Sequence, residues 1–327
     1  MNKVQWMSYI LIKHKSILVF IIFTIALVAL LMPSSVLPDI RSRLFYHLWQ
    51  SGHFLVFFLG SYLFYNLYPK FSHLDVGWQV VFLLIVAAIC ALAVEGLQAF
   101  LSGKTLELSD IIGDMAGVLL FLSLRTLHNG KMACLHGMTL VLIGFVMWPV
   151  LSSFIDVMLI RYQFPLLADF ETPFEASRFE GRTGAASITD EQSFHGRHSL
   201  KLSCFPGPWS GMMLQHFSSD WRGYSQLHIA VYNPNPQPVS FHIRIHDVVH
   251  EQGEKAYNDL YSEIISLQTG TWTQVEIPLV KIENAPAGRQ MDLEHIRGLG
   301  LFVVKEDKPL VLYIDTIMLE YKVLGKK

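Results

Sequence analysis

Cysteine is scarce in this chain of 327 residues, which contains only Cys90, Cys134 and Cys204. Three cysteines at this spacing form neither a disulfide framework nor a metal motif, and we interpret them as small buried hydrophobic residues. The sequence also lacks the GxSxG, HExxH and P-loop patterns. These absences remove the commonest hydrolase, metalloprotease and nucleotide-binding signatures, so the sequence favours a non-catalytic protein.

Charged residues are also scarce. They make up 16% of the chain, whereas 52% of the residues are hydrophobic and the mean hydropathy is +0.37. Residues 1–162 hold 10 Lys and Arg and 7 Asp and Glu, and residues 163–327 hold 15 and 20. This split predicts a multi-domain chain, with an apolar helical domain at 1–162 and a soluble domain at 163–327. The near-neutral total and the acidic second half argue against nucleic acid as a partner.

Long apolar runs are abundant in the first domain. A membrane-spanning helix needs about 20 apolar residues, and the first domain offers about five candidates, so we expect an α-helical transmembrane bundle in the lipid bilayer. We interpret the first run as a retained anchor, because it is long for a signal peptide and has no good cleavage site after it. The runs are 17–32, 53–68, 78–101, 108–124 and 135–155.

The positive charges between these runs predict an orientation. With the N-terminus in the cytoplasm, six Lys and Arg fall in inner segments and three in outer loops, which agrees with the positive-inside rule. Five spans then place residues 163–327 outside the cytoplasmic membrane. We therefore expect an integral cytoplasmic (inner) membrane protein with an extracytoplasmic, periplasmic C-terminal domain.

Polar residues inside apolar runs are costly, so they are candidates for function. Glu95 and Gln98 are three residues apart, and Asp110 and Asp114 are four apart, so each pair shares a helix face. In the expected topology His53 and three of these residues lie toward the outer side of the membrane, and Asp114 lies about one turn deeper. These residues form either a functional site or hydrogen bonds that hold short helices together.

The first domain carries three short motifs: His-Phe at 53–54, Glu-Gly-Leu-Gln-Ala-Phe at 95–100 and Ser-Asp-x-x-x-Asp-x-x-Gly at 109–117. In these motifs residues 45–125 resemble the VanZ-like membrane family. The family usually has Arg at the position of Lys104 and Asn at that of Asp114. The resemblance implies a small helical membrane domain without an established catalytic mechanism or cofactor, linked in some members to glycopeptide-antibiotic tolerance and resistance. The candidate polar membrane site is His53, Glu95, Gln98, Lys104, Asp110 and Asp114.

The sequence of the second domain predicts an all-β sandwich. Apolar and polar residues alternate with a period of two, and Pro- and Gly-rich turns separate the alternating runs. Many short strands over this length indicate a β-sandwich or jelly roll. The expected strands are 199–204, 226–232, 240–247, 273–279, 299–304 and 311–319.

Five segments of this domain are characteristic: Asp-Phe-Glu at 169–171, the segments 195–200, 220–224 and 270–275, and Tyr-Ile-Asp-Thr-Ile at 313–317. In these segments the domain resembles the galactose-binding-like jelly rolls of many carbohydrate-binding modules. The resemblance implies a structural Ca²⁺ between Glu171 and Asp315, because carboxylates suit a hard cation. An ordinary pair of surface acids is the alternative.

Two expected strands carry hydrogen-bonding and aromatic side chains on their outward positions. Such groups on a sheet face suit sugar binding, although a merely solvated face is also polar. Trp221 and Trp272 are expected to pack in the core or at strand edges. The candidate ligand-binding residues are His228, Tyr232, His242, Arg244 and His246.

The function that combines these features is a non-catalytic cell-envelope protein that engages a cell-wall glycan or a lipid-linked saccharide. One alternative is a membrane enzyme that acts on a lipid-linked sugar or head group, with Glu95 and His53 as acid and base. Another is an envelope scaffold or assembly factor whose β-domain binds a protein. A transporter is disfavoured, because the spans show no inverted repeat.

Overall fold

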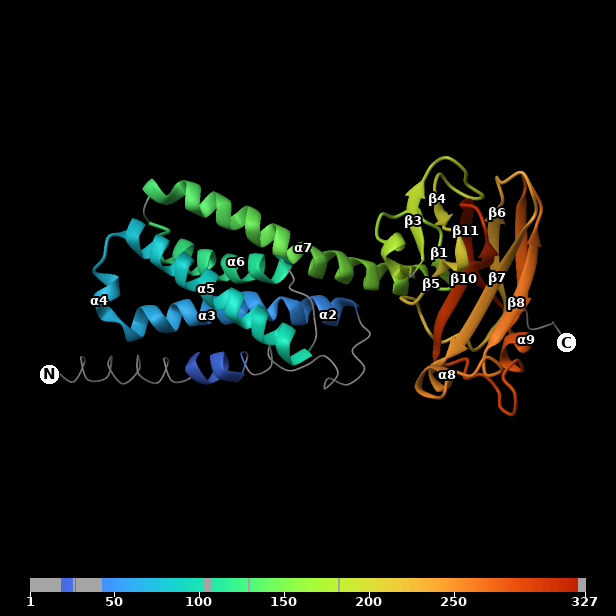
Figure 1. The fold of residues 1–327 in the computed structure, drawn as a ribbon, viewed down its shortest axis with the longest axis horizontal. Coiled ribbons are helices and arrows are strands. Elements are labelled where there is room, and N and C mark those ends of the chain that lie inside the picture. Colours follow the sequence, from blue (N-terminus) through green and yellow to red (C-terminus); the bar gives the residue numbers. More distant parts are fainter. Residues whose placement is uncertain are drawn as a thin grey trace. The chain divides into compact units, whose positions relative to one another are not determined.

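The computed structural model describes residues 19–25, 27, 43–102, 108–128, 130–181 and 183–322. The chain divides into two compact units, Met1–Phe154 and Ile155–Lys327. The first is helical and the second is a β-sandwich (Figure 1). The division falls inside the last long helix, close to the boundary expected from the sequence.

The helical unit contains four of the five expected apolar runs as helices. Half of the first run, 17–32, lies outside the described residues, and Lys104 lies outside them as well. The helices are α2 (Arg43–Gln50), α3 (Gly52–Leu67), α4 (Pro69–Ser72), α5 (Val76–Ser102), α6 (Leu108–Arg125), the short η2 (Gly130–Met132) and α7 (Ala133–Gln163).

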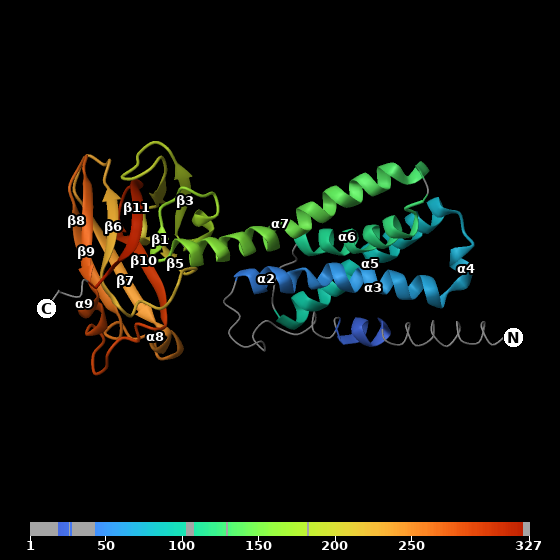
Figure 2. The same ribbon diagram turned by 180° about the vertical axis from the view of Figure 1, so that it is seen from behind.

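Helices α3 and α6 lie side by side and approach closely (Figure 2). The approach depends on Gly117, where an added Cβ atom would lie 2.3 Å from the carbonyl oxygen of Phe54. Small residues allow helix backbones to pack this tightly. Around this contact Val56, Phe57 and Leu122 form part of a buried apolar cluster, so the start of α3 is held against α6.

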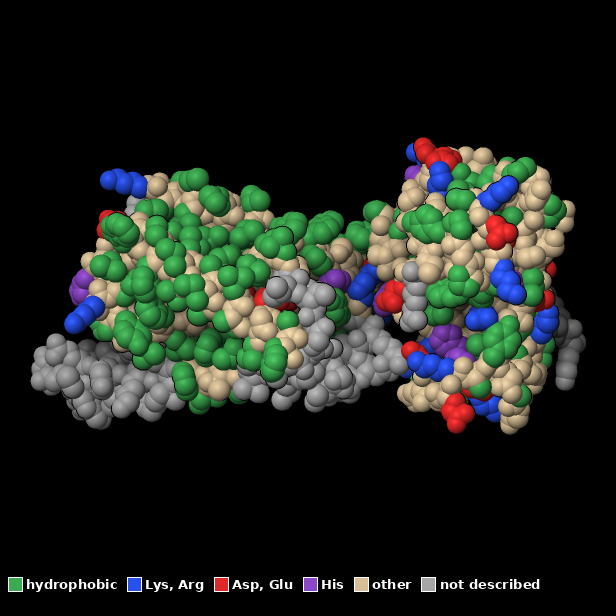
Figure 3. Space-filling view, in the orientation of Figure 1, with side chains coloured by type: hydrophobic (Ala, Val, Ile, Leu, Met, Phe, Trp, Pro, Cys, Tyr) green, Lys and Arg blue, Asp and Glu red, His purple; other side chains and the backbone are tan. Residues whose placement is uncertain are grey.

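The face of the helical unit seen in Figure 3 carries many apolar side chains. Two segments, Val76–Leu97 and Gly130–Gln163, are long and apolar enough to cross a membrane, with mean hydropathies of 2.8 and 2.1. In the most apolar 18-residue stretch of each segment, only 22% and 11% of the residues are buried inside the protein. The expected bundle of five spans is therefore not confirmed, and it stays a prediction.

The second unit is a sandwich of two antiparallel sheets. The β11 sheet has the strand order β3-β4-β11-β6-β9, with β1 also pairing with β11, and the β10 sheet has the order β2-β5-β10-β7-β8. The strands are β1 (Leu166–Ala168), β2 (Phe179–Gly181), β3 (Gly184–Thr189), β4 (Ser199–Cys204), β5 (Gly207–Leu214), β6 (Tyr224–Tyr232), β7 (Val239–Asp247), β8 (Tyr261–Leu267), β9 (Trp272–Pro278), β10 (Ile296–Glu306) and β11 (Leu310–Tyr321). The short helices are η3 (Glu175–Arg178), α8 (Val248–Gln252) and α9 (Leu279–Glu283).

The core of the sandwich follows the alternation seen in the sequence. The expected inward residues are buried, including Leu202 on β4, Ile229 on β6 and Ile243 on β7. Trp221 is fully buried, as expected, and its indole N–H donates to the Ser218 carbonyl oxygen. The prediction of a helical region followed by a β-sandwich is confirmed.

The end of α7 is fastened to the sandwich by a buried arginine. The Arg178 Nε atom donates to Asp156 Oδ1 at 2.9 Å, and Nη1 donates to the Leu167 carbonyl oxygen at 2.7 Å. Both charged side chains are fully buried. A buried arginine is costly unless it is paired and hydrogen-bonded, so the last turns of α7 belong to the second unit.

Candidate functional site

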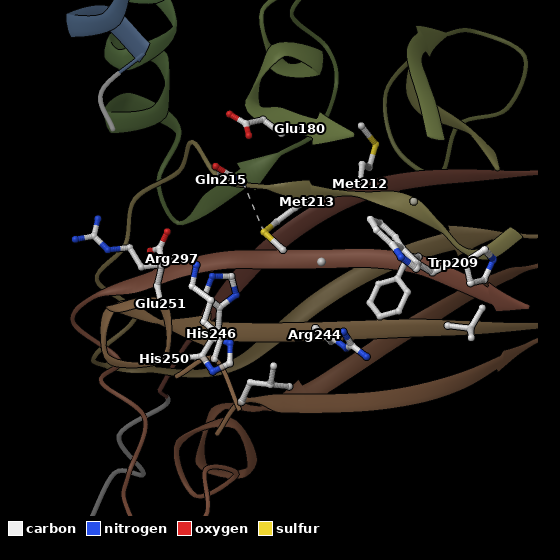
Figure 4. A pocket seen from close by; sticks show the side chains of 17 residues that line it. Glu180, Trp209, Met212, Met213, Gln215, Arg244, His246, His250, Glu251 and Arg297 are labelled. Atoms are coloured by element: carbon white, nitrogen blue, oxygen red, sulfur yellow. Dashed lines mark hydrogen bonds between the residues drawn. The ribbon is translucent and has the colours of Figure 1, made fainter. Parts of the chain in front are cut away.

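The outer face of the β10 sheet contains a hollow of about 550 Å³. Figure 4 shows side chains that line it, with Met213 near the middle of the labelled group. They come from β2, β5, β10 and β7, and from the helix α8 that follows β7. Four neighbouring strands and one helix therefore build a single concave surface.

Glycines on outward positions make the sheet floor deep. Gly211 of β5 and Gly300 of β10 both line the hollow. A Cβ atom added at Gly211 would meet the Leu301 carbonyl oxygen at 2.3 Å, so that position needs glycine. A Cβ atom added at Gly300 would make only ordinary contacts, the nearest at 3.6 Å from Arg244 Cβ. At Gly300 the missing side chain leaves open space for a ligand.

Aromatic and thioether groups form the apolar part of the hollow. The Trp209 side chain is 41% exposed, and Phe302 lies in the next strand with Met213 nearby. The Arg244 guanidinium lies over two rings, with its Cζ atom 4.8 Å from the centroids of both Tyr257 and Phe302. Stacking of this kind fixes a guanidinium in one orientation.

Nitrogen donors form the polar part. The Nε atoms of Arg244 and Arg297 are buried and have no hydrogen-bond partner among the described residues. The rings of His246 and His250 lie 5.3 Å apart. Burial, and then the charge of Arg244, lowers the pKa of His242, whose ring stacks on Phe302. Buried N–H groups without partners are rare, and they suit a ligand rich in acceptor oxygens.

A charged network holds α8 beside the hollow. Asp247 is fully buried, and its Oδ1 accepts from the backbone N–H of His250, which caps α8. Arg289 donates to both Asp247 oxygens, at 2.6 and 2.9 Å, and to Asp259. Burial acts to raise the pKa of Asp247, but the bonds from Arg289 and from two backbone N–H groups outweigh it and lower the pKa.

The structure separates the five residues expected to bind ligand. His242, Arg244 and His246 lie on β7 in the β10 sheet, and the last two line the hollow. His228 and Tyr232 lie on β6 in the β11 sheet, on the opposite outer face of the sandwich. The expectation that all five share one face is wrong, because β6 and β7 are consecutive in the chain but belong to different sheets.

The two residues on β6 have other partners. His228 Nε2 lies 3.1 Å from Glu320 Oε2, and the ring of Tyr232 packs against Trp272 and Tyr313. Sequence reasoning missed most of the hollow, including Trp209, Met213, His250 and Arg297. The turn signal Phe-Pro-Gly-Pro at 205–208 overlaps the start of β5 and hides the alternation that places Trp209 outward.

The predicted polar membrane residues lie together in the helical unit. His53 Nδ1 is 3.2 Å from Asp114 Oδ1, and His53 Nε2 is 3.6 Å from Asp110 Oδ2 and 3.9 Å from Glu95 Oε1. The His53, Glu95 and Asp114 side chains are almost fully buried, and that of Asp110 is 13% exposed. Gln98 lies on α5, but its side chain is outside the described part. We call His53, Glu95, Asp110 and Asp114 the helix cluster.

The expected calcium ligands, Glu171 and Asp315, both bind one loop. Asp315 Oδ2 accepts from the backbone N–H groups of Phe194 and His195, and its Oδ1 accepts from the N–H and hydroxyl of Thr316. Glu171 Oε1 accepts from the N–H groups of Arg197 and His198. Such donors fill the lone pairs that a cation needs, so the pair fits Ca²⁺ poorly and calcium binding stays a prediction.

No family model matches this chain, and no curated protein matches it. The VanZ-like resemblance of the helical unit therefore stays a prediction.

Solved structures do match the second half. A family 11 carbohydrate-binding module of a cellulosomal cellulase of Clostridium thermocellum aligns over 48% of this chain and 94% of its own, with 15% identity and a TM-score of 0.37. The CBM22-1 xylan-binding domain from Paenibacillus barcinonensis aligns over 48% and 93%, with 13% identity and a TM-score of 0.33. The sandwich thus resembles carbohydrate-binding modules.

An exo-beta-agarase also matches, with 17% identity and a TM-score of 0.39. The match covers 48% of this chain but 25% of the agarase chain. At these identities and scores the likeness concerns the sandwich fold, so no site residue is transferred from these proteins to this one.

Proposed function

We propose that the β-sandwich binds a glycan chain in the hollow on its β10 sheet, and that this binding is non-catalytic. The observation that carries the proposal is the combination of an open glycine floor at Gly300 with the exposed ring of Trp209 and the buried N–H donors of Arg244 and Arg297. A sugar ring has an apolar C–H face and a rim of oxygens. The hollow offers an apolar platform and donors to match.

The size and stiffness of the hollow support the same proposal. Its volume of about 550 Å³ lies within the range of about 300–1,000 Å³ that is usual for ligand sites. The stacked Arg244 and the network around Asp247 fix the donors before a ligand arrives. Fixed donors reduce the entropy lost on binding.

We also propose that the helical unit is embedded in the cytoplasmic membrane and that the sandwich lies outside it. Support comes from the apolar segments Val76–Leu97 and Gly130–Gln163, which are mostly not buried inside the protein. A core helix of a soluble protein would be mostly buried, and both segments lie far from the N-terminus, unlike a signal sequence. Large exposed apolar surfaces indicate a membrane or partner. An envelope role linked to glycopeptide tolerance, as the VanZ-like resemblance implies, is part of this proposal.

The test is a binding screen of the detergent-solubilised full chain against soluble polysaccharides, including mixed-linked β-glucan, xylan, agarose oligomers and peptidoglycan fragments. We expect at least one of them to bind. Trp209→Ala should weaken that binding at least tenfold, because the variant removes the exposed platform in the hollow.

The matched control is Trp272→Ala, which removes a tryptophan from β9 on the other sheet. This variant should bind as the wild type does. If no polysaccharide binds the wild type, or if both tryptophan variants behave alike, the proposal is wrong.

A further inference from the structure

Three helices bring four ionisable side chains to one point inside the helical unit. His53 lies at the start of α3, Glu95 on α5, and Asp110 and Asp114 on α6. The ligand atoms of His53, Glu95 and Asp110 all lie within 4.8 Å of one another. We propose that these three residues form a binding site for a divalent transition-metal cation of the Zn²⁺ type, with Asp114 as a positioning residue.

Asp114 sets the chemistry of the histidine. Its Oδ1 atom lies 3.2 Å from His53 Nδ1. In the proposed site the Nδ1–H group donates to this carboxylate, which leaves the Nε2 lone pair facing Glu95 and Asp110. A carboxylate that orients a histidine in this way is the usual companion of a metal-bound imidazole.

The distances around Nε2 suit a shared cation better than direct hydrogen bonds. Charge-assisted N–H···O bonds are about 2.7–2.9 Å long, whereas Nε2 is 3.6 Å from Asp110 Oδ2 and 3.9 Å from Glu95 Oε1. Two ligands bound tetrahedrally to one Zn²⁺ at about 2.0–2.2 Å lie roughly 3.3–3.6 Å apart. The separation of His53 Nε2 and Asp110 Oδ2 already lies at the upper end of this range, and Glu95 would move closer to both when a cation binds.

A second observation is an unsatisfied carboxylate oxygen on the residue that orients His53. The Asp114 side chain is fully buried, and its Oδ2 atom has no hydrogen-bond partner among the described residues. Buried carboxylates are normally paired or bound to metal. Asp110 is 13% exposed at its side chain, which leaves an entrance for the cation.

The donor set selects among cations. One imidazole nitrogen with two carboxylate oxygens favours Zn²⁺ or a similar transition metal, whereas Ca²⁺ and Mg²⁺ prefer all-oxygen sites. Three protein ligands leave at least one coordination position open for water or another molecule. The inference is independent of glycan binding by the sandwich.

The experiment is equilibrium dialysis of the chelator-treated full chain in detergent against Zn²⁺, with metal counted by elemental analysis. The wild type should take up one equivalent more than Glu95→Gln or Asp110→Asn, and a large excess of Mg²⁺ should not displace it. Asp114→Asn should keep the equivalent but bind about 10–100-fold more weakly, as expected when the partner of a metal-bound histidine is changed. The control is His73→Gln, which removes an exposed histidine outside the helix cluster and should change nothing.

Equal zinc uptake by the wild type and by the Glu95 and Asp110 variants would overturn the inference. If those variants do not fold, the thermal stability of the wild type with and without Zn²⁺ tests the inference instead. Saturating Zn²⁺ should raise its melting temperature, because a ligand that binds the folded state stabilises it. A melting temperature that Zn²⁺ leaves unchanged overturns the inference as well.

Discussion

Among single residues, Arg289 stabilises the edge of the hollow, because it binds the Asp247 carboxylate that caps α8. Its guanidinium bonds both oxygens of Asp247, which is fully buried, while Arg289 itself is 23% exposed at its side chain. Removing one partner of a buried ion pair leaves the other charge without compensation. The position of α8, and with it His250, therefore depends on this arginine.

We predict that Arg289→Met lowers the free energy of unfolding of the sandwich by about 3 kcal/mol at pH 7. The pKa of Asp247 is lower in the folded protein than in the unfolded chain. The contribution of the pair is therefore present above about pH 4 and is lost as the pH falls through the folded pKa. Urea unfolding at pH 7 and pH 3, followed by tryptophan fluorescence, measures both effects.

The control for this prediction is Arg222→Met. Arg222 pairs with Asp220 and Glu294, but its side chain is 56% exposed, and exposed pairs contribute about 0–1 kcal/mol. A loss at Arg289 that is no larger than the loss at Arg222, or that is the same at both pH values, would contradict the account of Asp247.

At the scale of elements, the contact between α3 and α6 positions the helix cluster. His53 comes from one of these helices, and Asp110 and Asp114 come from the other. Gly117 lies two turns after Asp110 on α6 and touches the α3 backbone. The helix spacing at Gly117 thus sets the distance between the histidine and its carboxylates.

We predict that Gly117→Val destabilises the helical unit by about 1–3 kcal/mol, as overpacking of a tight contact does. Gly144→Val on α7 is the matched control, because a Cβ atom added there has nothing within 4 Å. Thermal melting of the detergent-solubilised chain compares the two. Equal melting temperatures for the two variants would mean that the close contact between α3 and α6 is not important for stability.

The sequence predicts which side of each strand or helix is buried, but it does not predict which strands are neighbours. The alternation of Leu227, Ile229 and Val231 predicted which face of β6 is buried, because side chains alternate across a strand. Alternation does not say which strands pair, so the expectation that His228 and His242 share one sheet face is wrong. The spacing of Asp110 and Asp114 on one helix face indicated a shared site, because a helix repeats every 3.6 residues. The hollow depends on strand order and on Gly300, and neither has a local signal.

For the molecule as a whole, we propose that the two units occupy different environments. The helical unit exposes large apolar side chains such as Leu140 and Phe145 on α7. The sandwich encloses its own apolar core and carries most of the charge of the chain. A lipid environment suits the exposed apolar side chains of the first unit, and water suits the charged surface of the second.

We predict that reporter fusions after Tyr68 and Leu127 lie in the cytoplasm and that a fusion after Tyr162 lies outside, in agreement with the distribution of Lys and Arg. An enzyme active only outside the membrane and a fluorophore active only inside report the two cases. A cytoplasmic result at Tyr162 would contradict the envelope placement and make wall glycans inaccessible to the hollow.

Binding of a glycan in the hollow is best tested by measuring the glycan affinity of the full chain with Gly300→Val. A Cβ atom at Gly300 meets its nearest neighbours at 3.6 Å or more, and valine suits a strand, so we expect the melting temperature to stay unchanged. The new side chain should fill the floor of the hollow and abolish binding of the polysaccharide that the wild type selects. A folded Gly300→Val variant that binds this polysaccharide with wild-type affinity would show that the glycan site lies elsewhere.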